Sequence, residues 1–184
     1  NTAAVGRTNG ALVSGPAGSF DMFAAAFNSS GDQVWIDQLG TAGSSTTAAS
    51  AALDQNGNIY ITGNTGGSLD GKSVTGSYAV FAAKYSSAGA RQWTSLFPCG
   101  AEDMAASIVS DPEGNTFIAG SAKTGLNGTQ INGSVDAFLV GFDKDGIRGT
   151  TRLLGDVNMY TYGTGITLDS FGNIYLSGYT DVPF

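Results

Sequence analysis

The stretch DQNGNIYITG at residues 54–63 decides the fold, because the chain contains it three times. It returns as DPEGNTFIAG at 111–120 and as DSFGNIYLSG at 169–178, and AAVG at 3–6 matches its end. The glycines that close the four copies are spaced 57, 57 and 58 residues apart: Gly6, Gly63, Gly120 and Gly178. A period of this size indicates supersecondary units that bury their apolar surface against neighbouring copies.

Each copy predicts a strand, a tight turn and a second strand. A short run of apolar or small residues comes first, at 48–53, 105–110 and 163–168. The aspartate that follows can accept hydrogen bonds from its own turn, and the glycine supplies the positive φ that a short hairpin requires. We therefore assign a structural role in the turn to nine residues: Asp54, Gly57, Asn58, Asp111, Gly114, Asn115, Asp169, Gly172 and Asn173.

A second hairpin is predicted in the other half of each unit. Aromatic residues recur four apart there, which suits a helix or one face of a strand: Phe23 and Phe27, Phe81 and Tyr85, Phe138 and Phe142. Alanine between the first two pairs would allow a helix, but FLVGF at 138–142 has valine and a central glycine. Because equivalent copies adopt one structure, we interpret all three segments as strands that enter turns at Gly31, Gly89 and Gly146.

The unit is thus four antiparallel strands with one longer connection, near 65–77 and 122–134, in which Leu12, Leu69 and Leu126 recur in phase. Successive apolar residues in the strand that ends each copy indicate a sheet covered on both faces, as in a radial stack of blades. A β-helix would have a shorter period, and leucine-rich or ankyrin arrays need helices. The sequence predicts an all-β protein, a β-propeller of four-stranded antiparallel blades.

About three repeats of 57–58 residues are present in this prediction, as a single array over residues 1–184. We expect a partial blade at 1–40, blades at 41–98 and 99–155, and a second partial blade at 156–184. Propellers need roughly four to eight blades to close, so the ring is incomplete within this chain and its edges need cover. Further repeats outside the chain, copies of the chain, or an open stack of units would each provide it.

Composition argues against catalysis. The net charge is −7, from 15 acidic and 8 basic residues, which is unsuited to binding nucleic acid or anionic membranes. The chain has no histidine, and so lacks the imidazole of common nucleophilic triads and zinc sites. Its one cysteine, Cys99, is interpreted as packing, and the pair Glu102 and Asp103 as a solvated loop. We expect no enzyme activity and no membrane insertion.

Two kinds of ligand site were weighed against structural roles. Oxygen side chains in glycine-containing loops are how calcium is held, which makes candidates of Asp54, Asn56, Asn58, Asp143 and Asp145. The copies of the first turn vary between the aspartate and the glycine, with Pro112 and Glu113 in one and Ser170 and Phe171 in the other. The equivalents of the second loop are Asn-Ser-Ser-Gly and Ser-Ser-Ala-Gly, so the turn interpretation is favoured and no cofactor is expected. Trp35 and Trp93 are candidates for stacking on sugar rings, with packing between blades favoured. The triplets for N-glycosylation begin at Asn28, Asn127 and Asn132, and such triplets arise readily in a sequence rich in Ser, Thr and Asn.

The pattern D-x-x-G-N-x-Y-x-x-G-x-T, followed by a Leu-containing loop, Asp136-Ala-Phe138, a turn glycine and tryptophan, resembles the bacterial β-propeller repeat family called SBBP. The likeness covers essentially the whole chain. It departs where Ala79 replaces the aspartate and where Thr150 replaces the tryptophan. The resemblance implies an extracellular or cell-surface bacterial protein with a scaffold, adhesion or binding role, and no known reaction.

The function expected from these observations is a non-catalytic extracellular scaffold or assembly module of a bacterial surface structure or larger complex. Its partners would be copies of itself or other subunits. A propeller that binds carbohydrate or protein, in the manner of a lectin or adhesin, is the alternative hypothesis, since loops on a propeller face vary between copies. A fragment of a propeller enzyme is the third and least favoured.

Overall fold

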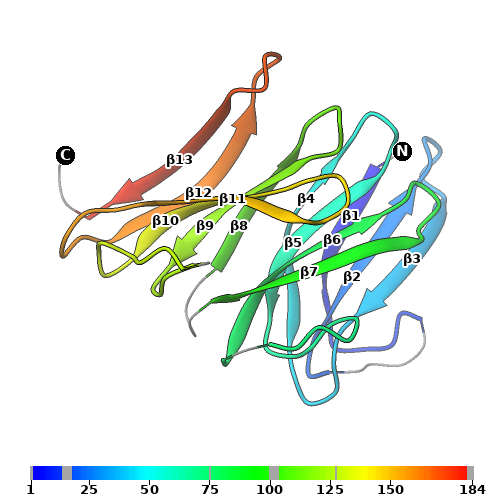
Figure 1. Ribbon diagram of the computed structural model, residues 1–184. Coiled ribbons are helices and arrows are strands. Elements are labelled where there is room, and N and C mark those ends of the chain that lie inside the picture. Colours follow the sequence, from blue (N-terminus) through cyan, green and yellow to red (C-terminus); the bar gives the residue numbers. More distant parts are fainter. Residues whose placement is uncertain (1, 14–17, 75, 100–103, 127, 182–184) are drawn as a thin grey trace.

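The computed structural model describes residues 2–13, 18–74, 76–99, 104–126 and 128–181, without the side chains of Pro98 and Cys99. This described part forms thirteen strands and no helix (Figure 1). The interpretations offered for Cys99, for Glu102 with Asp103, and for Asn127 concern side chains outside it.

The strands form four antiparallel sheets, which we call blades 1 to 4. Neighbouring strands in the chain are neighbours in each sheet. Blade 1 contains β1 (Thr2–Thr8), β2 (Asp21–Phe27) and β3 (Gln33–Leu39); blade 2 contains β4 (Thr46–Leu53), β5 (Ile59–Thr65), β6 (Tyr78–Tyr85) and β7 (Arg91–Cys99). Blade 3 contains β8 (Met104–Ser110), β9 (Thr116–Ala122), β10 (Asp136–Phe142) and β11 (Arg148–Leu154); blade 4 contains β12 (Thr161–Leu168) and β13 (Ile174–Thr180).

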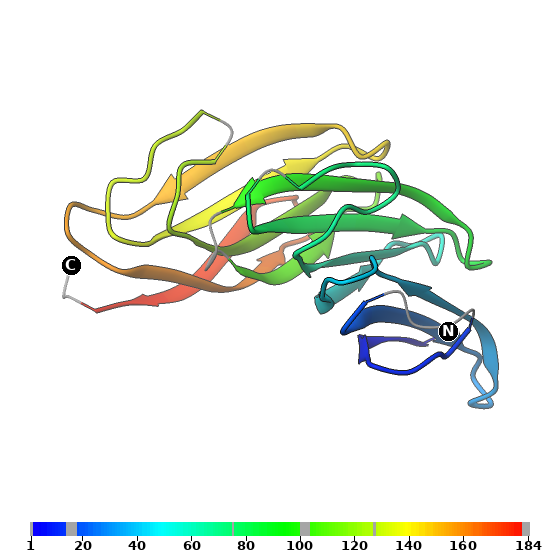
Figure 2. The same ribbon diagram turned by 90° about the horizontal axis from the view of Figure 1, so that it is seen from below.

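This architecture confirms the predicted all-β fold of four-stranded antiparallel blades. The blades follow one another from blue to red as an open fan, and the ring is not closed (Figures 1 and 2). The first strands of successive blades touch, β4 against β8 and β8 against β12. Blade 1 begins with β1, whose repeat equivalents β5, β9 and β13 are second strands of their blades.

Hairpin turns set the register within each blade. In the turn between β4 and β5, Asp54 and Asn58 pair through their backbones at 3.1 Å, and Gly57 has φ +76°. Gly114 and Gly172 adopt the same left-handed conformation in blades 3 and 4. This conformation is nearly free for glycine and unfavourable for other residues, so the repeated glycine has a direct structural cause.

Side chains of β2, β5, β6, β9 and β10 form the core. These strands are buried on both faces, as the continuous apolar runs predict. One buried cluster lies between blades 1 and 2 and includes Met22, Ile61 and Phe81. A second lies between blades 2 and 3 and includes Phe97 and Phe138. The hydrophobic core therefore consists of side chains packed between neighbouring blades.

Candidate functional site

In blades 2 and 3, a phenylalanine on the third strand lies over a glycine on the second. Phe81 is directly opposite Gly63, and a Cβ atom added to Gly63 would lie 2.8 Å from the Phe81 ring. Gly120 has the same relation to Phe138 at 2.6 Å. The backbone carbonyl oxygens of Thr47 and Met104 would be closer still, at 2.0 and 2.1 Å. Glycine is therefore required at these positions by the neighbouring strand as well as by the ring.

The ring also reaches the preceding blade. Phe81 belongs to the same buried cluster as Met22 and Leu39 of blade 1. Phe138 packs edge-on against Phe97 of blade 2, with ring centroids 5.9 Å apart. We call this place the aromatic seat. For Phe81 it is formed by Gly63 of its own blade and by Met22 and Leu39 of the blade before.

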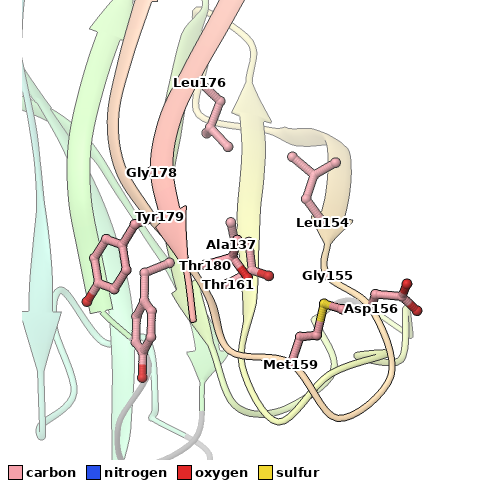
Figure 3. Close-up of a pocket in the computed structure, with 11 residues that line it drawn as sticks. Ala137, Leu154, Gly155, Asp156, Met159, Thr161, Leu176, Gly178, Tyr179 and Thr180 are labelled. Carbon is pink, nitrogen blue, oxygen red and sulfur yellow. The ribbon is translucent and has the colours of Figure 1, made fainter. Parts of the chain in front are cut away.

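Between blades 3 and 4 the corresponding seat is open. A pocket of about 580 Å³ lies there, and Leu176 of β13 and Leu154 of β11 project into it from opposite sides (Figure 3). Its lining includes Gly178, Ala137 and Leu154, which are the repeat equivalents of Gly63, Met22 and Leu39. The complete lining is Ala137, Leu154, Gly155, Asp156, Met159, Thr161, Tyr162, Leu176, Gly178, Tyr179 and Thr180.

The open seat has the chemistry of a site for an aromatic side chain. The three atoms nearest a Cβ on Gly178 are backbone atoms of Tyr162 and Gly163, whereas a phenylalanine ring is among the nearest at Gly63 and Gly120. Leu154 is 50% exposed, whereas its equivalent Leu39 is 6% exposed beneath blade 2. Blade 4 has no third strand in the described part of the chain, and the pocket is where the phenylalanine of that strand would lie.

Trp35 and Trp93 join consecutive blades at their outer edge. The indole N–H of Trp35 donates to the Ser87 carbonyl at 3.1 Å, and the ring stacks on Tyr85. A Cβ on Gly89, in the turn of blade 2, would be 2.6 Å from the Trp35 ring.

Trp93 repeats this arrangement on blade 3. It donates to the Lys144 carbonyl at 3.1 Å, stacks on Phe142 and covers Gly146. Gly31 in blade 1 has the same turn conformation, and nothing in the described chain lies within 4 Å of a Cβ placed on it.

The calcium candidate Asp54 uses its carboxylate inside its own turn. One oxygen accepts the backbone N–H groups of Asn56 and Asn58 at 2.9 Å, and the other accepts the Asn58 amide at 2.7 Å and the Tyr60 hydroxyl at 3.1 Å. Burial alone would raise the pKa of Asp54, but the hydrogen bonds from these residues hold it below its usual value.

The other two turns bond in the same manner. Asp111 accepts the side-chain amide of Asn115, and Asp169 accepts that of Asn173, both at 2.7 Å. The hydrogen bond from the Asn173 side chain is the main cause that lowers the pKa of Asp169.

Asp143 and Asp145, the second calcium candidates, do not converge. Asp143 accepts the backbone N–H groups of Asp145 and Ile147, and the Asp145 carboxylate pairs with Lys144 at 2.7 Å. Across the described residues, no group of three or more acidic, histidine or cysteine side chains is placed to hold a metal ion. The expectation that these turns bind no calcium stays a prediction, which calorimetric titration with calcium tests.

Two buried aspartates have a structural role that the sequence did not predict. Asp136 is buried and accepts the backbone N–H groups of Asn132 and Gly133, both at 2.9 Å. A Cβ on Gly155 would collide with this carboxylate at 2.0 Å. Asp21 is arranged likewise beside Gly40 in blade 1. The signal in the sequence was the recurrence of Asp-x-Phe with a glycine about 19 residues later.

A polar link between blades 1 and 2 was also missed. Arg91 of β7 pairs with Asp37 of β3 at 2.7 Å and bidentately with Asp70 at 2.9 Å. Tyr85 donates to Asp37 at 2.9 Å, and burial with the Asp37 charge raises the pKa of that phenol above its ordinary value. Asp37 and Arg91 are 54 residues apart, and the other copies do not repeat the pair, so no local pattern reveals it.

Comparison with known proteins identifies the repeat. Residues 34–70 and 151–184 match the SBBP family model, described as a beta-propeller repeat, which confirms the resemblance over those segments. Each match contains an Asp-x-x-Gly-Asn sequence and the first two strands of a blade, β4 and β5 or β12 and β13. No curated protein matches the chain. In the described residues, no helix is long and apolar enough to cross a membrane.

Proposed function

We propose that this chain, which carries β-propeller repeats of the SBBP family, is a non-catalytic scaffold and assembly module of a bacterial surface structure or larger complex. The observation that carries the proposal is the open aromatic seat at Gly178, Ala137 and Leu154. The chain shows twice, with Phe81 and Phe138, what such a seat holds. The partner that fits this seat is a strand with a phenylalanine, as in blades 2 and 3.

Burial of a phenylalanine in the open seat would stabilise the complex with the strand that carries it. Burying a phenylalanine side chain contributes about 1.5–3 kcal/mol, before the hydrogen bonds that a strand gains along β13. An exposed apolar pocket next to a free strand edge is also a hazard for uncontrolled association unless a specific partner covers it. A module built to receive a strand has both features.

Catalysis and sugar binding have less support. The absence of histidine in the 184 residues removes the commonest general base and zinc ligand. Trp35 and Trp93 use their indole N–H groups on backbone carbonyls and their rings on the next blade. These contacts favour packing between blades over sugar stacking as the role of both tryptophans.

The proposal is tested with a peptide that reproduces a third and fourth strand. Residues 134–154 span β10 and β11, include Phe138, and carry charges that favour solubility. We expect this peptide to bind the chain in calorimetric titration, and a Phe138→Ala peptide to bind about tenfold or more weakly. If both peptides fail to bind, or bind equally, the seat is not an assembly site.

An extracellular setting is part of the proposal, supported by the resemblance to a family of secreted and cell-surface proteins. Fractionation of the source bacterium tests it, with an antibody against the chain as the probe. We expect the protein in the medium or on the cell surface. Recovery confined to the cytoplasm would contradict this setting and leave the assembly role intact.

A further inference from the structure

We infer that the groove between the inner turns of blades 3 and 4 binds a lysine side chain of a partner protein. The inner turns are those that join the first and second strands of a blade, and they lie at one end of the sheets (Figure 1). The groove has a volume of about 350 Å³ and shares no residue with the lining of the open seat, so the inference does not rest on that site. Its complete lining is Ser110, Asp111, Pro112, Glu113, Phe117, Leu168, Asp169, Ser170, Phe171 and Gly172.

The equivalent place between blades 2 and 3 already holds a lysine. The ammonium of Lys84 lies over the Tyr60 ring, 5.1 Å from its centroid. The same nitrogen would be 3.9 Å from a Cβ atom on Gly114, in the inner turn of blade 3, and it donates to the Lys144 carbonyl at 3.3 Å. A lysine on the third strand of one blade therefore reaches the inner turn of the next, and an ammonium over an aromatic face is a favourable contact.

Blade 3 has no lysine at this position. Lys84 is directly opposite Tyr60 in its sheet, and Gly141 has the same place opposite Phe117. Phe117 also lacks the hydroxyl with which Tyr60 approaches the next turn. A Cβ atom on Gly172, the turn glycine of blade 4, would have no described atom within 4 Å. The space that a tyrosine and a lysine fill between blades 2 and 3 is thus open between blades 3 and 4.

This difference lies inside the described chain and not at either of its ends. β10 is described over its whole length and contains Gly141. Because the lysine of blade 2 reaches forward to blade 3, the equivalent side chain for this groove belongs to β10 of blade 3. Further strands beside β13 would border the groove on its outer side, and would leave glycine at 141 and phenylalanine at 117.

The charge of the groove favours a cation. Its carboxylates belong to Asp111, Glu113 and Asp169, and none of its lining residues is basic. Asp111 and Asp169 each accept the side-chain amide of the asparagine four residues later at 2.7 Å, which holds the carboxylates in place without neutralising them. Lys84 approaches the turn of blade 3 from the other side, where it lies over Tyr60. A positively charged group in the groove would be attracted by all three carboxylates.

Two aromatic rings make the site suited to lysine in particular. Phe117 of β9 and Phe171 of the turn between β12 and β13 both line the groove. Phe171 is 89% exposed, at a position where the other copies have Asn56 and Glu113. Phenyl rings attract an ammonium through their faces and also cover an apolar stem. Lysine combines both groups, as Lys84 does in the equivalent place.

Nuclear magnetic resonance titration with a lysine analogue tests the inference. The probe is Nα-acetyl-lysine methylamide, and Nα-acetyl-norleucine methylamide is the control, because it keeps the apolar stem without the ammonium. We expect the lysine compound to shift the amide resonances of Glu113, Phe171 and Gly172 in a saturable manner, and the norleucine compound to bind about tenfold or more weakly. Added sodium chloride should weaken the binding of the lysine compound, since salt screens the carboxylates.

Variants in the turns locate the site. Glu113→Gln and Phe171→Ala change exposed side chains, so folding should be unaffected. We expect each to weaken binding of the lysine compound about threefold to tenfold. Asp145→Asn and Ile147→Ala are the matched controls, because they remove an exposed carboxylate and an exposed apolar side chain from the outer turn of blade 3. Neither control should alter binding.

The outcomes decide between a lysine site and other possibilities. Saturable binding of the lysine compound that is lost in Glu113→Gln and Phe171→Ala supports the inference. Equal binding of the lysine and norleucine compounds overturns it and identifies an apolar groove. Absence of a saturable shift with both compounds, or equal sensitivity of the control variants, also overturns it. Each of these results leaves the proposed assembly role standing, because that role is tested by the contrast between the 134–154 peptide and its Phe138→Ala form.

Discussion

Glycine residues lie beneath aromatic rings both within and between the blades of this molecule. Gly63 and Gly120 lie beside phenylalanine of their own blade, and Gly89 and Gly146 beside tryptophan of the blade before. At each of the four positions a Cβ atom would collide with the ring. The repeated glycines therefore have a structural cause in close contacts to the backbone.

Gly146→Ala measures one of these contacts, with Gly31→Ala as its control. Both residues have positive φ, +80° and +87°, which costs alanine about 1–2 kcal/mol. Only at Gly146 would the new Cβ meet a tryptophan, at 2.6 Å, for about 1–3 kcal/mol more. We expect urea denaturation to show the larger loss of unfolding free energy for Gly146→Ala. Equal losses would mean that Trp93 does not press on this turn.

Acid should weaken the Asp54 turn. Hydrogen bonds hold the folded-state pKa of Asp54 below its ordinary value of 3.8, so the unfolded chain binds a proton more readily. The stability that Asp54 contributes is present above that ordinary pKa and is lost as the pH falls through the lower folded-state value. The free energy of unfolding of the wild-type protein should exceed that of Asp54→Ala by about 1–2 kcal/mol near neutral pH, and by less at low pH.

The check is urea denaturation of both proteins at several pH values. Asp54→Asn is the control, because it keeps one acceptor oxygen and cannot titrate in this range. A difference between wild type and Asp54→Ala that stays constant down to about pH 2 would contradict the assigned hydrogen bonds.

Hairpins are the elements that the sequence predicts best. The turn from Asp54 to Asn58 is decided by residues within five positions of one another, and the bonds involved are local. The strand assignment of FAAAF and FAAKY followed from their equivalence to FLVGF, and β2, β6 and β10 confirm it. The antiparallel order of the strands in each blade follows from the regular spacing of the repeated turns along the chain.

Contacts between elements of different blades could not be predicted. The open seat is lined by Gly178 of blade 4 and by Ala137 and Leu154 of blade 3. Whether it is open depends on the strand that lies beside β13, which no local pattern reveals. Leu12 was seen to recur in phase, but its exposure follows from its place at the uncovered face of blade 1. The ion pair of Arg91 and Asp37 does not recur in the other copies, so the repeat could not predict it.

Truncation of a seated ring tests the packing between blades 1 and 2. Phe81→Ala should cost about 3–5 kcal/mol of unfolding free energy, because Phe81 is fully buried between the sheets. Phe171→Ala is the control, since Phe171 lies in a turn and is 89% exposed. Thermal and urea denaturation measure both. A loss below about 1 kcal/mol for Phe81→Ala would show that the aromatic seat contributes little to the fold.

The whole molecule is an open array with two unlike faces. One presents the pocket beside β13, and the other presents Leu12 and the half-buried Phe23 of blade 1. Both faces carry repeat equivalents of side chains that are buried in the contacts between blades 1, 2 and 3. Unlike faces joined head to tail either close a ring or extend a fibre, and the rotation between blades decides which.

Calorimetric titration of the chain with the 134–154 peptide tests the central claim most directly. Assembly through the open seat predicts that this peptide binds, and that its Phe138→Ala form binds about tenfold or more weakly. Equal binding by the two peptides, or binding by neither, would contradict the claim.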